Sequence, residues 1–209
     1  MRDLSGNALT LHLTVLGDSL GYGTGASTPS NGFTEILYRT LSRDAAAHSF
    51  TNLSVPGATM NEVLTFQVPH IPSHADTLLL VVGANDVVNL NDRVIFGEHC
   101  GRLLGRIRAG APSARLFVTG IPNMAITPQV PDEAKPFVAS MCENLSAAMR
   151  EQAETHQGIF IDLFGITNLA DGHASRYLSE DDFHPSDRGY ALIARGALPV
   201  MQSILHGLT

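Results

Sequence analysis

The chain has 209 residues, a length typical of one compact α/β domain, so we expect a single domain over residues 1–209. Hydrophobic residues make up 44% of the sequence and charged residues 16%, a composition that supports a buried core and excludes disordered and collagen-like chains. The formal net charge of -7, without long like-charged runs, argues against a nucleic-acid partner, because phosphate binding needs clustered Lys and Arg.

Targeting and metal-binding motifs are not evident in the sequence. Residues 1–7 lack the unbroken apolar run of a secretory signal, and no segment is long and apolar enough to span a bilayer. We therefore expect a soluble, cytoplasmic protein without a transmembrane segment. His70 and His74 have the spacing of helical zinc ligands, but Pro69 and Pro72 interrupt any helix there, so we predict no metal site.

Short apolar runs alternate along the chain with stretches of helical periodicity. The apolar runs, which we predict to be strands, cover residues 9–16, 50–55, 77–82, 114–119 and 158–161. The predicted helices cover residues 33–42, 60–66, 93–108, 133–155 and 187–206. This alternation predicts a parallel sheet between two helix layers, joined by right-handed crossovers. Ligands in such folds bind beyond the carboxyl ends of the strands.

A serine follows the first predicted strand in the sequence GDSLG, residues 17–21. Ser19 therefore lies where a parallel sheet opens toward solvent, and it is the candidate nucleophile. Because a serine hydroxyl is a poor nucleophile at neutral pH, this role requires a base within hydrogen-bond reach and a group that orients the base. We expect the neighbouring Asp18 to stabilise the turn by local hydrogen bonds.

Two other patterns match the same stretch, and neither fits its context. The G-x-S-x-G elbow of α/β-hydrolases follows several strands, whereas only one predicted strand precedes Ser19. The glycines of residues 21–26 resemble a dinucleotide fingerprint, but Pro29 and Asn31 come before any helix, and the second strand does not end in an acidic residue. We predict no nucleotide cofactor.

Glycines and polar side chains also follow the second and third predicted strands. Gly57 allows the backbone to approach a ligand closely, so its N–H can face an oxyanion. Asn85, after Gly83, can supply a second donor. Near the C-terminus, His184 precedes the last predicted helix and follows two aspartates. In a catalytic triad His184 takes the proton of Ser19, and a carboxylate fixes the imidazole tautomer.

Taken together and in this order, these four motifs resemble the SGNH hydrolase family, also called GDSL esterases and lipases. The resemblance implies a three-layer α/β/α sandwich with a five-stranded, mainly parallel sheet. It implies Ser19 as nucleophile, His184 as base and Asp181 as the acid, with an oxyanion hole formed by the Ser19 and Gly57 N–H groups and the Asn85 side chain. No cofactor is implied.

The orienting acid has alternatives in the sequence. Asp182 is one residue from Asp181, and Asp162 follows the fifth predicted strand. We expect Asp187 to be the N-cap of the last helix, where its carboxylate accepts hydrogen bonds from free N–H groups.

Apolar residues in two predicted loops are typical of an acyl pocket. We expect the substrate-binding wall to include Val87, Ile121, Pro122 and Met124. Such a wall predicts a small-molecule ester of short to medium acyl chain as substrate. Carbohydrate O-deacetylation, in which Asn123, Tyr177 and Asn89 contact hydroxyls, and thioester hydrolysis are alternatives on the same site. A non-catalytic binding module with this fold is the alternative from another class.

Overall fold

The computed structural model describes residues 10–89, 92–168 and 174–205 and contains one five-stranded sheet. Its strands are β1 (Thr10–Gly17), β2 (Ala47–Asn52), β3 (Thr77–Val81), β4 (Arg115–Thr119) and β5 (Ile159–Ile161). They lie in the order β2-β1-β3-β4-β5, and every neighbouring pair is parallel. The predicted parallel sheet is therefore confirmed.

The α-helices range from three to 21 residues. They are α1 (Ser19–Tyr22), α2 (Phe33–Leu41), α3 (Met60–Glu62), α4 (Ala84–Asn89), α5 (Arg93–Gly110), α6 (Lys135–Thr155), α7 (Leu163–Thr167) and α8 (Asp187–Leu205). The short 3-10 or π-helical segments are η1 (Pro29–Asn31), η2 (Ser42–Asp44), η3 (Val63–Gln67), η4 (Val68–His70), η5 (Met124–Ile126) and η6 (Ala174–Arg176). Within the described residues, no helix is both long and apolar enough to cross a membrane.

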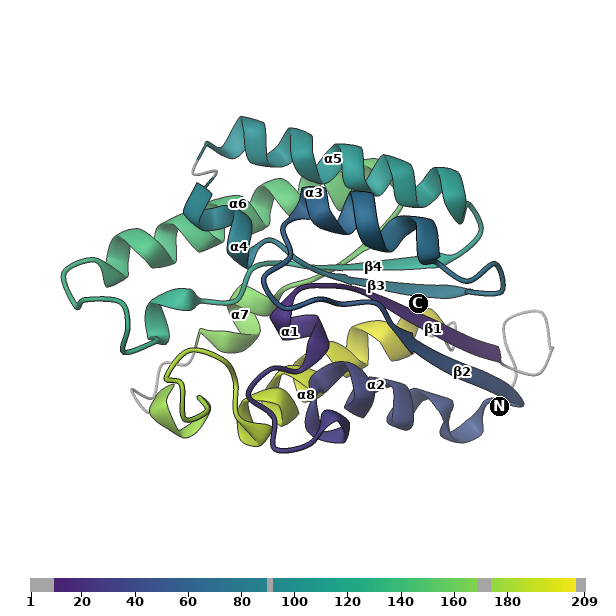
Figure 1. Ribbon diagram of the computed structural model, residues 1–209, viewed down its shortest axis with the longest axis horizontal. Helices are drawn as coiled ribbons and strands as arrows, with labels where there is room; N and C mark the ends of the chain where they lie inside the picture. Colours follow the sequence, from purple (N-terminus) through teal and green to yellow (C-terminus); the bar gives the residue numbers. More distant parts are fainter. Residues whose placement is uncertain (1–9, 90–91, 169–173, 206–209) are drawn as a thin grey trace.

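Helices cover both faces of the sheet (Figure 1). On one face, α3, α5 and α6 pack over side chains that include Leu78 and Leu80 of β3. On the other face, α2 and α8 pack over Leu79 and Val81 of the same strand. Successive side chains of a strand point to opposite faces, so an entirely apolar strand is the expected sequence for a strand buried on both sides. This arrangement is the predicted α/β/α sandwich.

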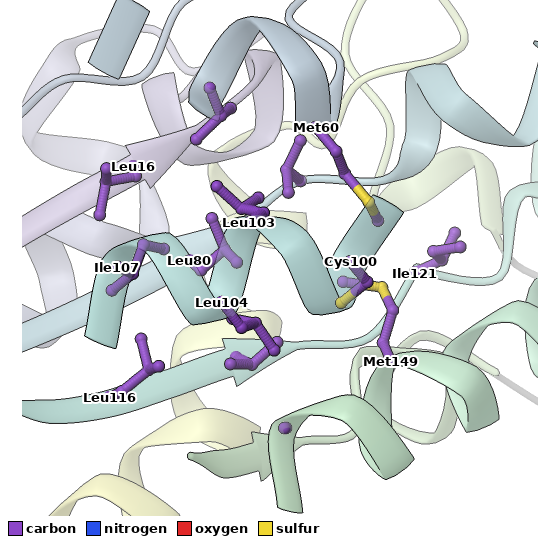
Figure 2. Packing of buried hydrophobic residues seen from close by; sticks show 14 of the residues in the cluster. Leu16, Met60, Leu80, Cys100, Leu103, Leu104, Ile107, Leu116, Ile121 and Met149 are labelled. Carbon is purple, nitrogen blue, oxygen red and sulfur yellow. The ribbon is translucent and has the colours of Figure 1, made fainter. Parts of the chain in front are cut away.

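The core under α5 is shown in Figure 2, where leucines of three strands meet the buried face of the helix. The contacting side chains include Leu16, Leu80 and Leu116 from the sheet and Leu103, Leu104 and Ile107 from α5. All of them are fully buried. Burying one such side chain stabilises the fold by about 1.5–3 kcal/mol. This packing makes the sheet a rigid base for the loops at its carboxyl edge.

The order of the strands changes direction between β1 and β3, which are paired neighbours. The chain crosses from β1 to β2 on one side and then returns past β1 to β3, so the winding direction reverses between these two strands. In sheets of this order, ligands bind at that reversal, beyond the carboxyl ends of the strands. Ser19 follows β1, and Asn85 follows β3. Both residues therefore lie at the expected position.

The second predicted strand is misplaced: residues 50–55 were expected, and β2 spans Ala47–Asn52. It is an edge strand with exposed or half-exposed side chains, so its polar start carries no apolar signal. The helix predicted over residues 60–66 begins as expected and changes to π-helical winding in η3. The short helices α1, α4 and α7 are not predicted, because they have at most six residues and show no periodicity. Leu9 and His206, at the ends of two predicted elements, lie outside the described residues.

Candidate active site

Ser19 begins α1 directly after β1. The Asp18 carboxylate accepts a hydrogen bond from the Leu20 N–H at 2.9 Å and so caps this short helix, as expected from the sequence. Gly17 allows the close approach of β1 and β3 at this point, because a Cβ there would lie 2.0 Å from the Val81 carbonyl oxygen. The turn after β1 thus places the Ser19 side chain at the carboxyl edge of the sheet.

The structure brings His184 and Asp181 to Ser19, although 165 positions separate Ser19 from the histidine. His184 Nε2 lies 3.0 Å from Ser19 Oγ, and His184 Nδ1 lies 2.6 Å from Asp181 Oδ2. When Nδ1 carries the proton and donates a hydrogen bond to the carboxylate, Nε2 is free to accept the Ser19 hydroxyl proton. The three side chains therefore have the connectivity of a Ser-His-Asp triad.

Asp181 is held in place by its own loop. Its Oδ1 atom accepts hydrogen bonds from the Ser179 hydroxyl and from the backbone N–H groups of Phe183 and His184, at 2.8–2.9 Å. Desolvation alone raises the pKa of Asp181, but these hydrogen bonds and that of the His184 side chain outweigh it and hold the pKa well below its usual range. The carboxylate consequently stays ionised beside the imidazole. Ser179 has no role in our sequence-based predictions, and the polar Ser-x-Asp spacing of the turn is the signal that identifies it.

The other aspartates considered as the acid have different partners. Asp162 caps α7 through the Gly165 N–H at 3.0 Å and lies 3.7 Å from Arg150. Asp182 is exposed, with a left-handed φ of 55°. These positions leave Asp181 as the carboxylate that contacts His184.

The prediction that Asp187 caps α8 is wrong. Its carboxylate accepts hydrogen bonds from the Ser27 backbone and hydroxyl and from the Asn31 amide, at 2.6–2.9 Å. Asp187 is the first residue of α8, and the side chain of Ser186 accepts the Gly189 N–H instead. Asp187 thereby joins the start of α8 to the loop after α1.

Asn85 and the loop that contains Gly57 lie together. Gly57 is exposed and has a φ of 85°, a left-handed conformation that favours glycine. The Asn85 amide nitrogen donates to the Ala58 carbonyl oxygen at 3.0 Å, and the Asp86 carboxylate accepts the Met60 N–H at 3.1 Å. Two consecutive residues of α4 therefore bind the loop on either side of Thr59. The sequence-based prediction assigned no role to Asp86.

Two buried carboxyl groups lie under this site. Burial raises the pKa of Asp18 from 3.8 to about 7, and the charge of Asp86 adds to this effect. Burial also raises the pKa of Asp86, to about 6, against the opposing hydrogen bond from Met60. Both side chains are at most 2% exposed. The base of the site thus favours neutral carboxyl groups, while Asp181 at its rim stays charged.

A cavity of about 80 Å³ adjoins Ser19 and His184. Its lining residues are Asp18, Ser19, Leu20, Ala84, Pro122, Asn123, Met124, Ile126, Thr127, Thr167, Tyr177, Leu178, Phe183, His184, Pro185, Gly189, Leu192 and Ile193. Most of the wall is apolar, and Asn123 and Tyr177 contribute polar groups. α8 presents Leu192 and Ile193 to the cavity, and Ile193 also belongs to the buried core.

Two of the four predicted wall residues line this cavity, namely Pro122 and Met124. Val87 and Ile121 do not, because they are only 3% and 1% exposed and belong to the core beneath α5. Figure 2 shows Ile121 in that core, near Met149. An apolar residue after a strand can face either the site or the core, and sequence alone does not distinguish the two directions. Asn89, a proposed hydroxyl contact, has a side chain outside the described residues.

Among residues 10–89, 92–168 and 174–205, no group of three or more His, Cys, Asp or Glu side chains is arranged to hold a metal ion. His70 and His74 accordingly form no such group within these ranges.

Solved structures with the same fold include several ester hydrolases. A family 3 carbohydrate esterase from Clostridium thermocellum is 19% identical, with a TM-score of 0.73 over 95% of this chain and 98% of that one. A lipase from a goat rumen metagenome is 21% identical, with a TM-score of 0.71 over 91% and 97%. Phospholipase A1 from Streptomyces albidoflavus is 22% identical, with a TM-score of 0.69 over 94% and 99%. At these identities the similarity establishes the fold.

No curated protein sequence matches the chain. The model of the GDSL-like lipase/acylhydrolase family, however, matches residues 15–192. This match covers well over half of the sequence and includes every residue of the Ser19, His184 and Asp181 arrangement. The chain therefore belongs to the GDSL-like lipase/acylhydrolase family.

Proposed function

We propose that the protein is a serine hydrolase that cleaves carboxylic esters of short to medium acyl chain through an acyl-enzyme intermediate. The observation that carries this proposal is the line of hydrogen bonds from Asp181 through His184 to Ser19, beside an apolar cavity. Ser19 begins α1 after β1, and Asp181 and His184 lie in the loop before α8, so one sheet and its connections supply all three residues. This supports one catalytic domain over residues 1–209.

In the first step, Ser19 Oγ attacks the ester carbonyl carbon while its proton passes to His184 Nε2. The C–O bond to the alcohol then breaks, and His184 donates the proton to the leaving alkoxide, which leaves an acyl group on Ser19. In the second step, water attacks the acyl carbon and gives a proton to His184; the bond from this carbon to Ser19 Oγ then breaks, His184 returns the proton to Oγ, and the carboxylic acid is released. Asp181 stays ionised throughout and stabilises the imidazolium that forms in each step.

The negative charge that develops on the carbonyl oxygen requires donors that are already in place. We assign this role to the backbone N–H groups of Ser19 and Gly57 and to the Asn85 amide. The bond from Asn85 to the Ala58 carbonyl supports the assignment, because it holds the amide beside the Gly57 loop. Loss of one such donor raises the barrier by about 2.7–4 kcal/mol in comparable enzymes.

The cavity is the proposed acyl site. Its walls are largely apolar, and its volume of about 80 Å³ is small beside the ~300–1,000 Å³ of pockets for drug-sized ligands. A cavity of this size favours the shorter acyl groups. Pro122 and Met124 form part of the wall. We place the alcohol portion of the ester outside this cavity.

Removal of an acetyl group from a sugar is a second candidate activity. An acetyl group fits a small cavity, and Tyr177 in the wall can hydrogen bond to hydroxyl groups, whereas the Asn123 amide already bonds to Asn168 and to the Ala125 N–H. The fold shared with a carbohydrate esterase is consistent with this alternative. A binding module without turnover is less well supported, because it has no need of a histidine within hydrogen-bond distance of a serine hydroxyl.

The decisive experiment is hydrolysis of p-nitrophenyl esters from acetate to laurate by wild type, Ser19→Ala and His184→Ala. Ser73→Ala and His70→Ala are matched controls, because both side chains are exposed and neither lines the cavity. We expect turnover that is greatest for short chains, unchanged in the controls and reduced by about 10⁴–10⁶-fold in the two site variants. The binding module would instead be supported by two results from a folded wild type. It would hydrolyse no ester, including acetylated sugars, and Ser19 would not react with a fluorophosphonate.

A further inference from the structure

Gln67 binds the backbone of the residue two positions before the proposed nucleophile. Its side-chain oxygen accepts the Gly17 N–H at 2.8 Å, and its side-chain nitrogen donates to the Gly17 carbonyl oxygen at 2.8 Å. The side chain is 3% exposed, so both hydrogen bonds are shielded from water. An amide carries a donor and an acceptor together, as a peptide group does, and no other uncharged side chain of this length offers both.

The position of this amide is explained by the sheet. β1 pairs with β3 as far as Gly17, but its pairing with β2 ends at Val15 and Asn52. Beyond that point the chain leaves β2, although the Leu53 N–H still donates to the Val15 carbonyl oxygen at 2.8 Å and the Val55 N–H to the Gly17 carbonyl oxygen at 3.0 Å. Without Gln67, the Gly17 N–H on the β2 side would have no acceptor in this buried position. The glutamine therefore replaces the missing neighbouring strand.

The helix that carries Gln67 is wound to reach this site. η3 (Val63–Gln67) is a π-helical turn that ends at Gln67, with the Val68 N–H bonded to the Val63 carbonyl oxygen. π-Helical turns within helices are rare overall. Those that occur are often found at functional sites, where the extra residue redirects a side chain. Here the redirected side chain contacts the last residue of β1, from which the chain turns to Asp18 and Ser19.

We propose that Gln67 is a positioning residue that sets the direction in which the chain leaves β1 and so fixes Ser19 relative to His184. It acts through Gly17 and makes no contact with the substrate. This role rests on the proposed esterase function, since it concerns the same nucleophile. A displacement of about 1 Å in a reacting group can lower the rate by about 100-fold, so a buried tether near Ser19 affects turnover directly.

The test compares Gln67→Met, which keeps a side chain of similar length without the amide, and Gln67→Glu, which keeps an acceptor and loses the donor. Val63→Ala is the matched control, because Val63 is fully buried in the same turn and makes no hydrogen bond to Gly17 through its side chain. For both Gln67 variants we expect kcat to fall by roughly 10- to 100-fold, with KM changed by less than about threefold. Val63→Ala should lower the melting temperature and leave kcat near that of wild type.

Hydrogen exchange at the Gly17 amide, followed by NMR, gives a readout that does not depend on turnover. We expect this amide to be protected in wild type and Val63→Ala and to exchange much faster in Gln67→Met. An unprotected Gly17 amide in wild type, or a folded Gln67→Met with wild-type kcat, would overturn the proposal. If wild type hydrolyses no ester, the proposed function fails, and the exchange comparison still decides whether Gln67 holds the turn.

Discussion

The Asp86 carboxylate accepts the backbone N–H of Met60 at 3.1 Å, immediately beside the bond from Asn85 to the Ala58 carbonyl. These two neighbouring side chains connect the start of α4 to the loop of Gly57. Asp86 is 2% exposed, and the N–H that it accepts is buried with it. The loop proposed to hold an oxyanion donor is therefore fixed by a residue that has no direct part in the reaction.

Asp86→Ala leaves the Met60 N–H without its acceptor. We expect a loss of about 1–3 kcal/mol in the free energy of unfolding and a lower kcat, while Asp86→Asn, which keeps an acceptor oxygen, loses less of both. Urea unfolding and ester hydrolysis measure the two effects. Asp92→Ala is the control, since it removes the exposed N-cap of α5 and costs about 1 kcal/mol without contact to the Gly57 loop. If Asp86→Ala and Asp92→Ala have the same kcat, the Gly57 loop does not need Asp86.

Asp18 makes the stability of the protein depend on pH. Burial raises its pKa from 3.8 to about 7, so the folded state binds the proton more tightly than the unfolded state. The stabilisation from this group is complete below about pH 4, declines as the pH rises to about 7 and is absent above that value. At about 1.4 kcal/mol for each pH unit, the decline is roughly 4 kcal/mol.

Asp18→Asn should therefore be more stable relative to wild type at pH 8 than at pH 4, because the amide keeps an acceptor for Leu20 and has no charge to bury. Chemical unfolding at several pH values measures this difference. Asp132→Asn serves as control, since Asp132 is exposed and its pKa is lowered by Lys135, so its effect is constant above pH 5. A difference between Asp18→Asn and wild type that does not change with pH would contradict the argument.

Asp181→Asn is expected to lower kcat by about 10⁴-fold, because an amide at this position favours the wrong tautomer of His184. In wild type, kcat/KM should rise with pH along its acidic limb, since only the neutral imidazole is a base. Protonation of Asp181 does not change the pH dependence of kcat/KM in this range, because the pKa of Asp181 lies well below the pH values of the assay. Stopped assays across pH 5–9 test both statements, and a rate independent of pH at acidic values would argue against His184 as the base.

Ile126→Phe adds volume to the wall of the cavity and should shift the preference toward shorter acyl chains. Each methylene excluded from an apolar site is worth about 0.8 kcal/mol, so the ratio of hexanoate to acetate hydrolysis should fall by about tenfold or more. The ratio of the two kcat/KM values measures the effect directly. Val94→Phe, on the exposed start of α5, should leave the ratio unchanged. An unchanged ratio in Ile126→Phe would place the acyl chain outside this cavity.

The elements near the sheet centre could be predicted closely from sequence. β1 and β3 are rich in Leu and Val because both faces of these strands are largely buried, and their predicted and observed limits agree within one residue. The edge strand β2 was predicted with the wrong limits, since its half-exposed side chains lack that signal. The π-helical turn that ends at Gln67 leaves no trace in the periodicity of the predicted helix.

Some features of the candidate site could likewise be predicted from the sequence, and others could not. The motifs around Ser19, Asn85 and His184 follow from the sequence, because the first two follow strand ends, the third precedes the last helix, and all occur in a fixed order. The sequence could not indicate whether Ile121 faces the cavity or the core, or that Asp187 bonds to Ser27 rather than to its own helix. Both features depend on which segment, distant in sequence, packs beside the residue in the folded protein.

By itself, the sequence determined the fold class, the family and the residue types available for acyl transfer, because these depend on local patterns of apolar residues and on short motifs. Only the tertiary structure decided the partners of several other polar groups: Ser27 for Asp187, Met60 for Asp86 and Gly17 for Gln67. A buried donor or acceptor must find a partner, but many residues along the chain offer one. The choice among them is made by packing, which brings together side chains that lie far apart in sequence.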